Sequence, residues 1–253
     1  MILIPSSGVL PPKELPSGTN DVHLWSARLD ISGDYLRQLE ATLSPDECRR
    51  AEKFTLDQHR AHFIAGRGFL RSILGYYLQI EPAHILFTYN SYRKPGLDPS
   101  TGQDMLHFNL AHSNGVALFA FTRGAEIGVD IEFIRDDTDI EQTGAMVFSP
   151  AEISTLRALP PEMRRLAFFQ YWTRKEAFIK AVGQGLTLPL RHFDVSGSPE
   201  NAVANVGDRH EHLGFTNWYV RDVSPLQGYA AAIACAGNDW QVSGFRMPDT
   251  HPF

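Results

Sequence analysis

Ser44-Pro45-Asp46-Glu47 returns later in the chain as Ser149-Pro150-Ala151-Glu152. Each tetrapeptide is a capping box, in which a Ser and the Glu three residues after it satisfy free backbone N–H groups at the start of a helix. A Pro at the first helical position strengthens both signals. The sequence therefore predicts two helix starts of the same kind, and an internal duplication is the first hypothesis that follows from them.

The residues after each capping box extend the similarity. Apolar residues at three- and four-residue spacing predict long amphipathic helices over residues 59–77 and 163–182, and each helix runs into a glycine, Gly75 or Gly183. Placing Gly75 on Gly183 keeps helix, loop and following strand in one register. The same alignment pairs Arg67 with Lys175, Ile80 with Leu188, and His84 with His192.

Two apolar runs, residues 116–121 and 229–234, each end at a glycine turn and lead into a second run, residues 127–133 and 240–245. This pattern predicts two β-hairpins. Helix, turn and hairpin also recur in α+β proteins by architectural habit, so an arrangement without duplication is the alternative. We expect duplication, because the helix starts, the helix register and the strand runs agree.

On this basis we predict an α+β fold of two similar lobes related by pseudo-twofold symmetry, each with a long helix packed on a small antiparallel sheet. Residues 1–20, which contain four prolines, are expected to form an extended lead-in. Residues 21–125 would form the N-terminal lobe and residues 126–253 the C-terminal lobe. The cleft between the lobes is the natural site, and a monomer is expected because both lobes belong to one chain.

The composition limits the classes of function. The chain has 253 residues, 43% of them hydrophobic, which is enough for two lobes. A formal net charge of −6 argues against a general nucleic-acid binder, so a polyanionic ligand would need a local group of cations. No secretory signal or membrane-spanning run is evident, and two cysteines are too few for a disulfide framework. We therefore expect a cytoplasmic protein.

An acidic pair interrupts one of the predicted strands. Asp130 and Glu132 are two residues apart, which puts both carboxylates on one face of the strand and Val129 and Ile131 on the other. Strands disfavour Asp, and adjacent like charges repel, so the pair costs stability unless water or a cation neutralises it. An exposed strand face is the simpler interpretation of such a pair alone, but one cation could reach both carboxylates.

The long helix predicted in the second half carries a matching column of side chains. Trp172, Glu176 and Lys180 follow one another at four-residue steps, so an aromatic ring, an acid and a base share one face. Glu and Lys at this spacing often form a plain surface pair, but the flanking residues are apolar and indicate a helix buried on more than one side. Three carboxylates without His or Cys suit a hard cation that binds phosphate, such as Mg²⁺.

Cations that could bind phosphate occur in three places. His112 lies in a segment whose Asn, Ser and Gly predict a turn with exposed backbone N–H groups, although a purely structural role for the ring is the alternative. Arg93, Lys94 and Pro95 fall in a long loop over residues 92–103. Further arginines and lysines line the helices of the first half, where we expect most of them to be solvated.

Four sequence blocks occur in one order. They are FNLAHS (108–113), GVDIE (128–132), FSPAE (148–152) and WTRKEAFIKAVGQGL (172–186). Together these blocks closely resemble the signature blocks of the Sfp-type phosphopantetheinyl transferases, a group with a duplicated two-lobe chain. The resemblance runs from about Leu43 to about Val195 and is weaker towards the final strands. It implies the two-lobe fold expected above.

The resemblance also implies a set of site residues. The implied Mg²⁺ ligands are Asp130, Glu132 and Glu176, and the implied catalytic residues are Glu176, Lys180 and Asp130. For coenzyme A, the resemblance implies that Lys180 contacts the diphosphate and that Ala111 and His112 contact a phosphate. It places Arg93, Lys94 and Pro95 at the adenine end. The 3′-phosphate would bind Arg60, with His62 and Arg50 as alternatives. Many relatives have Ser where this chain has Ala111, so a side-chain contact there would be absent.

The activity that the resemblance implies is Mg²⁺-dependent transfer of 4′-phosphopantetheine from coenzyme A to a serine of a carrier protein, which releases adenosine 3′,5′-bisphosphate. Glu176 would also take the serine proton, and Lys180 would stabilise the leaving group. The partner would be an apo acyl, polyketide or peptidyl carrier protein, with Phe148 as a candidate contact. Two alternatives stay open: a magnesium-dependent phosphohydrolase of coenzyme A or a nucleotide, and a non-catalytic binding module.

Overall fold

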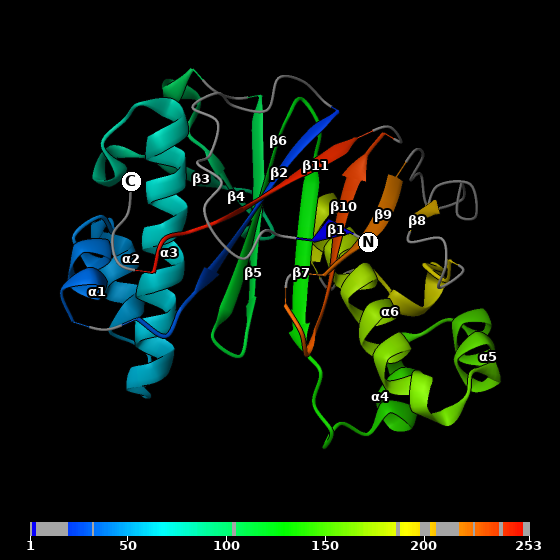
Figure 1. Cartoon of the computed structure of the whole chain (residues 1–253). Coiled ribbons are helices and arrows are strands. Elements are labelled where there is room, and N and C mark those ends of the chain that lie inside the picture. Colours follow the sequence, from blue (N-terminus) through cyan, green and yellow to red (C-terminus); the bar gives the residue numbers. More distant parts are fainter. Residues whose placement is uncertain are drawn as a thin grey trace.

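The structure, a computed structural model, describes residues 2–3, 20–31, 33–102, 105–185, 188–197, 203–205, 218–224, 226–237 and 240–249. Most of the predicted lead-in, residues 4–19, lies outside these ranges. The described residues form an α+β fold, as predicted, with sheets in the middle and helices on the outside (Figure 1). Among them, no helix combines the length and the apolarity that crossing a membrane requires.

Two four-strand paths form the centre of the fold. The first sheet runs in the order β11 (Gln241–Arg246), β2 (Asp21–Arg28), β6 (Val116–Arg123) and β5 (Leu106–Ser113). The second sheet runs in the order β1 (Ile2–Leu3), β9 (Trp218–Ser224), β10 (Tyr229–Ala236) and β7 (Ile127–Phe133), and β8 (Val203–Asn205) pairs with β9. Neighbouring strands are antiparallel except that β11 is parallel to β2 and β1 is parallel to β9. A separate pair joins β3 (Phe87–Tyr89) and β4 (Pro95–Leu97).

Helices cover the outer faces of both sheets. The two long helices are α3 (Asp57–Leu78) beside the first sheet and α6 (Pro161–Val182) on the second. Shorter helices α1 (Gly33–Glu40) and α2 (Pro45–Ala51) contact α3, and α4 (Ile140–Val147) and α5 (Pro150–Ala158) contact α6. The described residues also form the short 3₁₀ helices η1 (Pro82–His84), η2 (Pro99–Thr101) and η4 (Leu190–His192).

Both long helices were predicted, but only the second ends at its glycine. Gly183 caps α6 in the left-handed conformation, whereas α3 continues through Gly75 and ends at Gln79. Gly75 is needed for a different reason, because a Cβ atom there would lie 2.7 Å from the carbonyl oxygen of Ile80. The chain folds back against the helix at this point, and only glycine leaves room for it.

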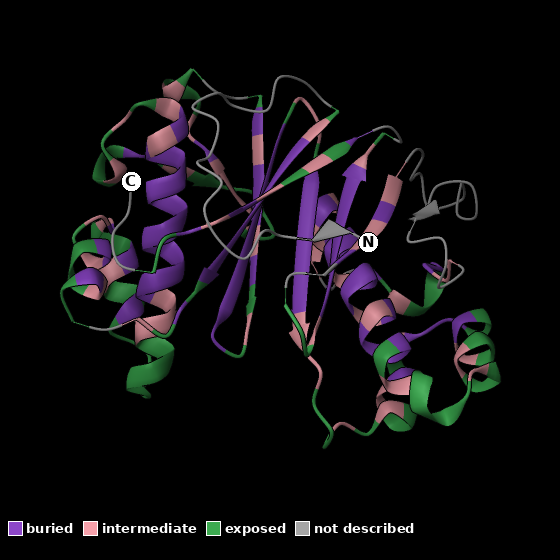
Figure 2. Cartoon of the chain, viewed as in Figure 1, coloured by how far each residue is buried: buried purple, intermediate pink, exposed green. Residues whose placement is uncertain are grey.

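Successive side chains of β6 point to opposite faces of the first sheet and pack into two different apolar cores. Leu118 and Ala120 of β6 share an apolar cluster with Val129 and Ile131 of β7, so the two sheets pack face to face. Phe119, between them in sequence, joins the cluster that contains the inner face of α3. The fold therefore has four layers, helix, sheet, sheet and helix, and Figure 2 shows the buried residues concentrated in the strands and along α3 and α6.

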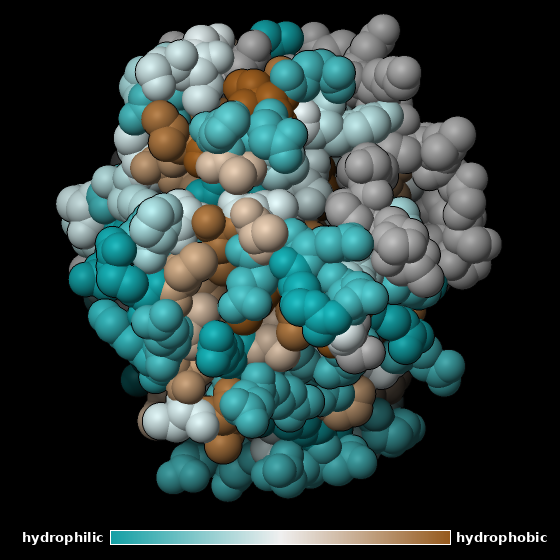
Figure 3. Space-filling view, turned by 90° about the vertical axis from the view of Figure 1, so that its left-hand side faces the viewer, coloured by the Kyte–Doolittle hydropathy of each residue, from teal (hydrophilic) through white to brown (hydrophobic). Residues whose placement is uncertain are grey.

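The outer surface over α1, α2 and α3 is mainly hydrophilic (Figure 3). This agrees with the exposed positions that dominate α1, α2 and the first turns of α3. The apolar side of α3 faces inward, where Ala65, Phe69 and Ile73 pack against the first sheet. The long helix is therefore held by its buried face, as the apolar spacing predicts.

Both predicted hairpins are wrong. β7 pairs with β10 and not with β6, and β11 pairs with β2 and not with β10. The chain passes from the first sheet to the second between β6 and β7, and their apolar faces pack against each other across the two sheets. The two chain-terminal strands also exchange: β1 joins the second sheet and β11 joins the first.

A buried ion pair follows each capping box. Both predicted capping boxes are present, at the starts of α2 and α5, and both capping glutamates are buried. Glu47 lies 2.7 Å from Arg71 and 3.3 Å from Arg67, and Glu152 lies 2.8 Å from Lys175. The basic side chains also bond two backbone carbonyls in each half, those of Pro82 and Ile85 from Arg71 and those of Leu190 and Phe193 from Lys175. These carbonyls correspond in the predicted register, but the cations that bond them do not, because the register pairs Lys175 with Arg67 and not with Arg71. The duplication therefore stays a prediction.

Candidate active site

Close packing of α6 on β7 creates the centre of the site. A Cβ atom at Gly128 would lie 2.1 Å from the carbonyl oxygen of Ala177 and 2.4 Å from the amide nitrogen of Ala181. Only glycine therefore allows the helix to approach the strand so closely. As predicted, Asp130 points to the helix side of β7, since it bonds a residue of α6 while Val129 lies in the core between the sheets.

Asp130 is the most buried acid of the site. It is 4% exposed, its Oδ1 atom accepts a bond of 2.6 Å from Nζ of Lys180, and its Oδ2 atom has no hydrogen-bond partner among the described residues. Burial raises the pKa of Asp130 to about 7, with Lys180 opposing the rise and Glu132 and Glu176 adding to it. The buried oxygen is thus an acceptor that the protein itself leaves unsatisfied.

The other two predicted acids lie around Asp130. Oε2 of Glu132 accepts a bond of 2.8 Å from the hydroxyl of Ser113. Burial raises the pKa of Glu176, and the charge of Glu132 adds to the rise although Lys180 opposes it. Three carboxylates that repel one another, with one empty acceptor at the centre, suit a divalent cation with oxygen ligands.

The three carboxylates do not converge on one point as they stand. Within the ranges that the structure describes, no group of three His, Cys, Asp or Glu side chains is arranged to hold a metal ion. Asp130 instead bonds Lys180, and Glu132 bonds Ser113. Asp130, Glu132 and Glu176 would have to turn towards one another to hold one cation.

His112 lies where the two lobes meet. It is an exposed residue of β5, next to the last residue of the strand, yet neighbouring protein atoms remove part of the water around the ring. This desolvation lowers the pKa of His112, and the positive charges of Lys180, His62 and His59 lower it further. Residues from α3, β5 and α6 therefore form one cationic region, beside the acids.

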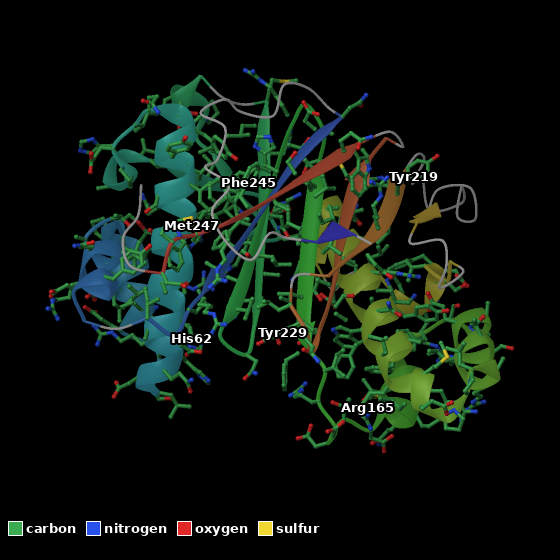
Figure 4. All side chains as sticks on the ribbon, viewed as in Figure 1. His62, Arg165, Tyr219, Tyr229, Phe245 and Met247 are labelled. Atoms are coloured by element: carbon green, nitrogen blue, oxygen red, sulfur yellow. The ribbon has the colours of Figure 1, made fainter. Side chains whose placement is uncertain are left out.

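Among the three candidates on the first-lobe helices, the structure brings His62 to this region. Its ring nitrogen lies 2.7 Å from Asp30, and its side chain is 15% exposed. Arg60 instead lies 3.5 Å from Glu40, and Arg50 lies over the ring of Phe63. Figure 4 shows His62 on α3, on the side of the helix towards the strands.

The predicted adenine loop connects the two lobes. Nζ of Lys94 lies 2.6 Å from Glu126 and 2.8 Å from the carbonyl oxygen of Ala181 at the end of α6. Burial opposes the ionisation of Glu126, but His107 and Lys94 together lower its pKa to about 2. Lys94 therefore joins the loop of the first half to Glu126 and to the end of α6. No pattern in the sequence indicated this role.

A pocket of about 350 Å³ opens beside Lys94. Its lining includes Lys94, Pro95, Tyr89 and His107. Arg93, the third residue predicted here, has a positive φ of 66° and is not part of that lining. A non-glycine residue in this conformation is strained. The contact of this loop with adenine stays a prediction.

The buried position of Phe148 corrects one expectation. Its side chain is 0% exposed and packs against Phe168 and Tyr171, so it cannot contact a carrier protein. The residue closes the core under α4 and α5 instead. An apolar residue directly before a capping box commonly packs back onto its helix, and this signal was available in the sequence.

Two contributors to the site were missed, Ser113 and Gly128. Ser113 lies in the FNLAHS block, where period-two alternation puts it on the same face as Ala111 and Asn109. Gly128 opens the GVDIE block, and a glycine inside a strand pattern is a sign of close backbone approach. Both signals were present, but neither identifies the partner residue.

Comparisons with known proteins identify the family of the chain. The family model described as 4′-phosphopantetheinyl transferase superfamily matches residues 126–234, which include β7 and α6. The chain is 39% identical to 4′-phosphopantetheinyl transferase HetI of Nostoc sp. over 91% of its own length and 94% of the relative's. It is 27% identical to 4′-phosphopantetheinyl transferase Sfp of Bacillus subtilis over 78% and 84% of the two chains.

Among solved structures, the one titled Chronobacterium ammoiniagenes apo-ACPS structure matches 45% of this chain and 98% of its own, with 21% identity and a TM-score of 0.31. That score is too low to add to the argument. The similarity to HetI covers nearly the whole of both chains. The chain therefore belongs to the 4′-phosphopantetheinyl transferase superfamily.

Proposed function

We propose that this transferase moves 4′-phosphopantetheine from coenzyme A to a serine hydroxyl of an apo carrier protein, in a reaction that requires Mg²⁺. The observation that carries the proposal is Asp130, a buried carboxylate with one oxygen on Lys180 and the other without a partner among the described residues. Glu132 and Glu176 surround it with further negative charge. Such a group is ionised at neutral pH only where positive charge compensates it, and a cation would add to the charge that Lys180 supplies.

Asp130, Glu132 and Glu176 would hold the ion, and their oxygen-only donor set fits Mg²⁺ better than a softer metal. Bound there, Mg²⁺ would neutralise charge on the diphosphate of coenzyme A. Lys180 is on the last turn of α6 with its side chain 31% exposed, so it can leave Asp130 and turn towards a phosphate.

The reacting groups then have defined tasks. Glu176 accepts the proton of the carrier serine, directly or through one water, as the serine oxygen bonds the phosphorus of the phosphopantetheine. The bond between this phosphorus and the bridging oxygen of the diphosphate breaks, and adenosine 3′,5′-bisphosphate leaves. Lys180 stabilises the negative charge that develops on the leaving oxygen.

Coenzyme A carries roughly four negative charges at neutral pH, whereas the chain has a net charge of −6. Binding therefore depends on the local cations. The positive charges of Lys180 and His62 both act on His112. Because its pKa lies below the ordinary value, His112 is mainly neutral at pH 7 in the free protein, where it can donate an N–H to a phosphate oxygen.

The carrier would dock on the second lobe beside α6. Met146, Met163 and Leu166 are large apolar residues exposed on α4 and the start of α6, and Arg164 and Arg165 lie among them. Carrier domains are generally acidic helical bundles, which suits an apolar surface with a basic margin.

Leu166→Glu should raise the KM for the carrier about tenfold and leave the KM for coenzyme A unchanged, whereas Met105→Glu, on an exposed site of the first lobe, should change neither.

The transfer is tested by incubating the protein with coenzyme A, Mg²⁺ and a panel of apo carrier domains, followed by mass spectrometry of the carriers. We expect one carrier to gain the mass of one phosphopantetheine group, and this gain to be lost with Glu176→Gln and with a chelator. Loss of Glu176 should cost several kcal/mol of barrier, where about 1.4 kcal/mol corresponds to tenfold in rate.

The two alternative activities predict different products. A phosphohydrolase would release free phosphopantetheine without any carrier, and a binding module would show no metal dependence.

The protein is also expected to be a monomer, because both sheets and both long helices come from one chain. Light scattering should give a mass near 28.3 kDa, and a trimer would contradict this expectation.

A further inference from the structure

The edges of the two sheets meet at β5 and β7 without a backbone ladder between them in the described part of the chain. Two side chains of β5 make the connection instead. Oδ1 of Asn109 accepts a bond of 3.0 Å from the backbone N–H of Val129, and Oγ of Ser113 accepts one of 3.1 Å from that of Phe133. These bonds satisfy N–H groups that would otherwise be open edge donors of β7.

The two bonds enclose the acidic pair. Asn109 and Ser113 are four residues apart on β5, and the N–H groups that they bind are four residues apart on β7. Four residues of strand span about 13 Å. Asp130 and Glu132 lie within this span, so β7 is fixed to the first lobe on both sides of the acids.

Ser113 alone also touches one of the acids. Its hydroxyl donates to Oε2 of Glu132 at 2.8 Å while it accepts from the N–H of Phe133. A serine hydroxyl has a single hydrogen, so donation to Glu132 fixes the orientation of both groups. One carboxylate oxygen of Glu132 is thereby held at the strand edge, and Oε1 stays available to a ligand.

We propose that Ser113 is a positioning residue that holds Glu132 ready to bind the cation, and that Asn109 fixes the other end of the same strand segment. This inference rests on the proposed function, in which Glu132 is one of three acids that hold Mg²⁺. Partners of metal-binding carboxylates in other proteins contribute roughly 10- to 100-fold to metal affinity. Without its hydroxyl partner, Glu132 would turn among several rotamers before it bound the ion.

The test measures metal binding without turnover. Mn²⁺, which takes the same oxygen ligands, is titrated into metal-free protein at pH 8 while the signal of free Mn²⁺ is followed by electron paramagnetic resonance. Ser113→Ala should bind Mn²⁺ about tenfold more weakly than the wild type. Ser113→Thr, which keeps a hydroxyl at this position, should restore most of the affinity.

Tyr229→Phe is the matched control. The Tyr229 hydroxyl donates to the backbone oxygen of Asn114 at 2.8 Å, so it joins the second lobe to the residue next to Ser113 without touching Glu132. Tyr229→Phe should bind Mn²⁺ like the wild type. An equal loss of affinity in this variant would mean that loosening the turn is enough, and would overturn the inference.

A double-mutant cycle separates the inference from its premise. In a Glu132→Ala background, Ser113→Ala should weaken Mn²⁺ binding no further, because the group that it positions is gone. Equal affinity of the wild type and Ser113→Ala overturns the inference alone, whereas a wild type that binds no Mn²⁺ overturns the proposed metal site and the inference together. If Ser113→Ala fails to fold by circular dichroism, Ser113→Cys, with similar volume and a weak donor, replaces it in the same comparison.

Discussion

Asp130 is both a proposed metal ligand and a buried acid that lowers the stability of the metal-free protein. It is nearly fully buried, and its Oδ2 atom has no partner among the described residues. A pKa raised from 3.8 to about 7 means that ionisation is less favourable in the folded chain than in the unfolded one. The metal-free protein therefore loses stability as the pH rises from about 4 to about 7, and Lys180 limits the loss.

Asp130→Asn should therefore stabilise the metal-free protein at pH 8, by about 1–3 kcal/mol, while it abolishes transfer. The neutral amide removes a buried charge, and Lys180 can reach solvent. Urea unfolding in a chelator measures the stability. Glu132→Gln, at a half-buried acid that already has a partner, is the control and should change stability little. A destabilised Asp130→Asn protein would show that the bond to Lys180 outweighs the cost of burial.

A second buried group, His23, gives a pH dependence remote from the site. Its Nδ1 atom lies 2.7 Å from the hydroxyl of Tyr77, which in turn accepts a bond from the indole of Trp25, so the imidazole is held neutral. Burial lowers the pKa of His23 to about 4, with Asp21 opposing the shift. The unfolded chain then binds a proton between about pH 6.5 and pH 4 that the folded chain does not.

The contribution of His23 to stability should consequently be full above pH 6.5 and fall as the pH drops towards 4, by at most about 1.4 kcal/mol per pH unit. Denaturant unfolding of the wild type and of His23→Gln across pH 4–7.5 measures the difference, since the variant cannot titrate here. The wild type should lose stability more steeply with falling pH. Parallel curves for the two proteins would contradict this assignment.

At the scale of elements, the contact between α6 and β7 decides whether the acids of the strand meet those of the helix. Gly128 allows this contact, because any side chain there would overlap the backbone of α6. The helix carries Glu176 and Lys180, and the strand carries Asp130 and Glu132. Separating the two elements by even a fraction of an ångström would change every distance in the site.

Gly128→Ala should accordingly destabilise the protein by about 3 kcal/mol or more and reduce transfer at least a hundredfold. The closest atoms belong to backbone, so the strain cannot be relieved by turning a side chain. Gly96→Ala, in β4, is the control, since a Cβ atom there meets only Thr88 at 3.8 Å. Thermal unfolding and the carrier assay measure both effects, and a Gly128→Ala protein with normal activity would refute the packing argument.

At the scale of the whole molecule, the exchange of terminal strands binds the two halves into one unit. β11 comes from the end of the chain but lies in the first sheet beside β2, where Phe245 packs 5.1 Å from the ring of Trp25. Figure 4 shows Phe245 and Met247 on the side of α3 and not of α6. The stability of the first lobe therefore depends on residues far along the sequence.

Phe245→Ala should cost about 3–5 kcal/mol, because it empties a buried position in the core under α3. Hydrogen exchange should show loss of protection in α3 before α6. Phe54→Ala, at a partly exposed ring in the first lobe, should have little effect. Loss of protection confined to α6 would mean that β11 belongs functionally to the second lobe.

The sequence by itself determined the local features: both capping boxes, the two long helices, the face on which Asp130 lies, and the column on α6 with Glu176 and Lys180. These follow from periodicity and from contacts between residues that are close in the chain, so a single sequence contains the information. The family resemblance rested on the same short blocks. Its assignment of Mg²⁺ and coenzyme A to those residues stays a proposal.

Only the tertiary structure decided which strands pair, how Lys94 joins the lobes to Glu126, that Phe148 is buried, and that Ser113 holds Glu132. Each of these contacts joins segments whose partners are chosen by the burial and hydrogen bonding of the whole chain. Local sequence is compatible with several pairings, as the two mistaken hairpins show. The choice among these pairings depends on which arrangement buries the two inner sheet faces against each other. The surface that an arrangement buries depends on the whole chain and not on any single segment.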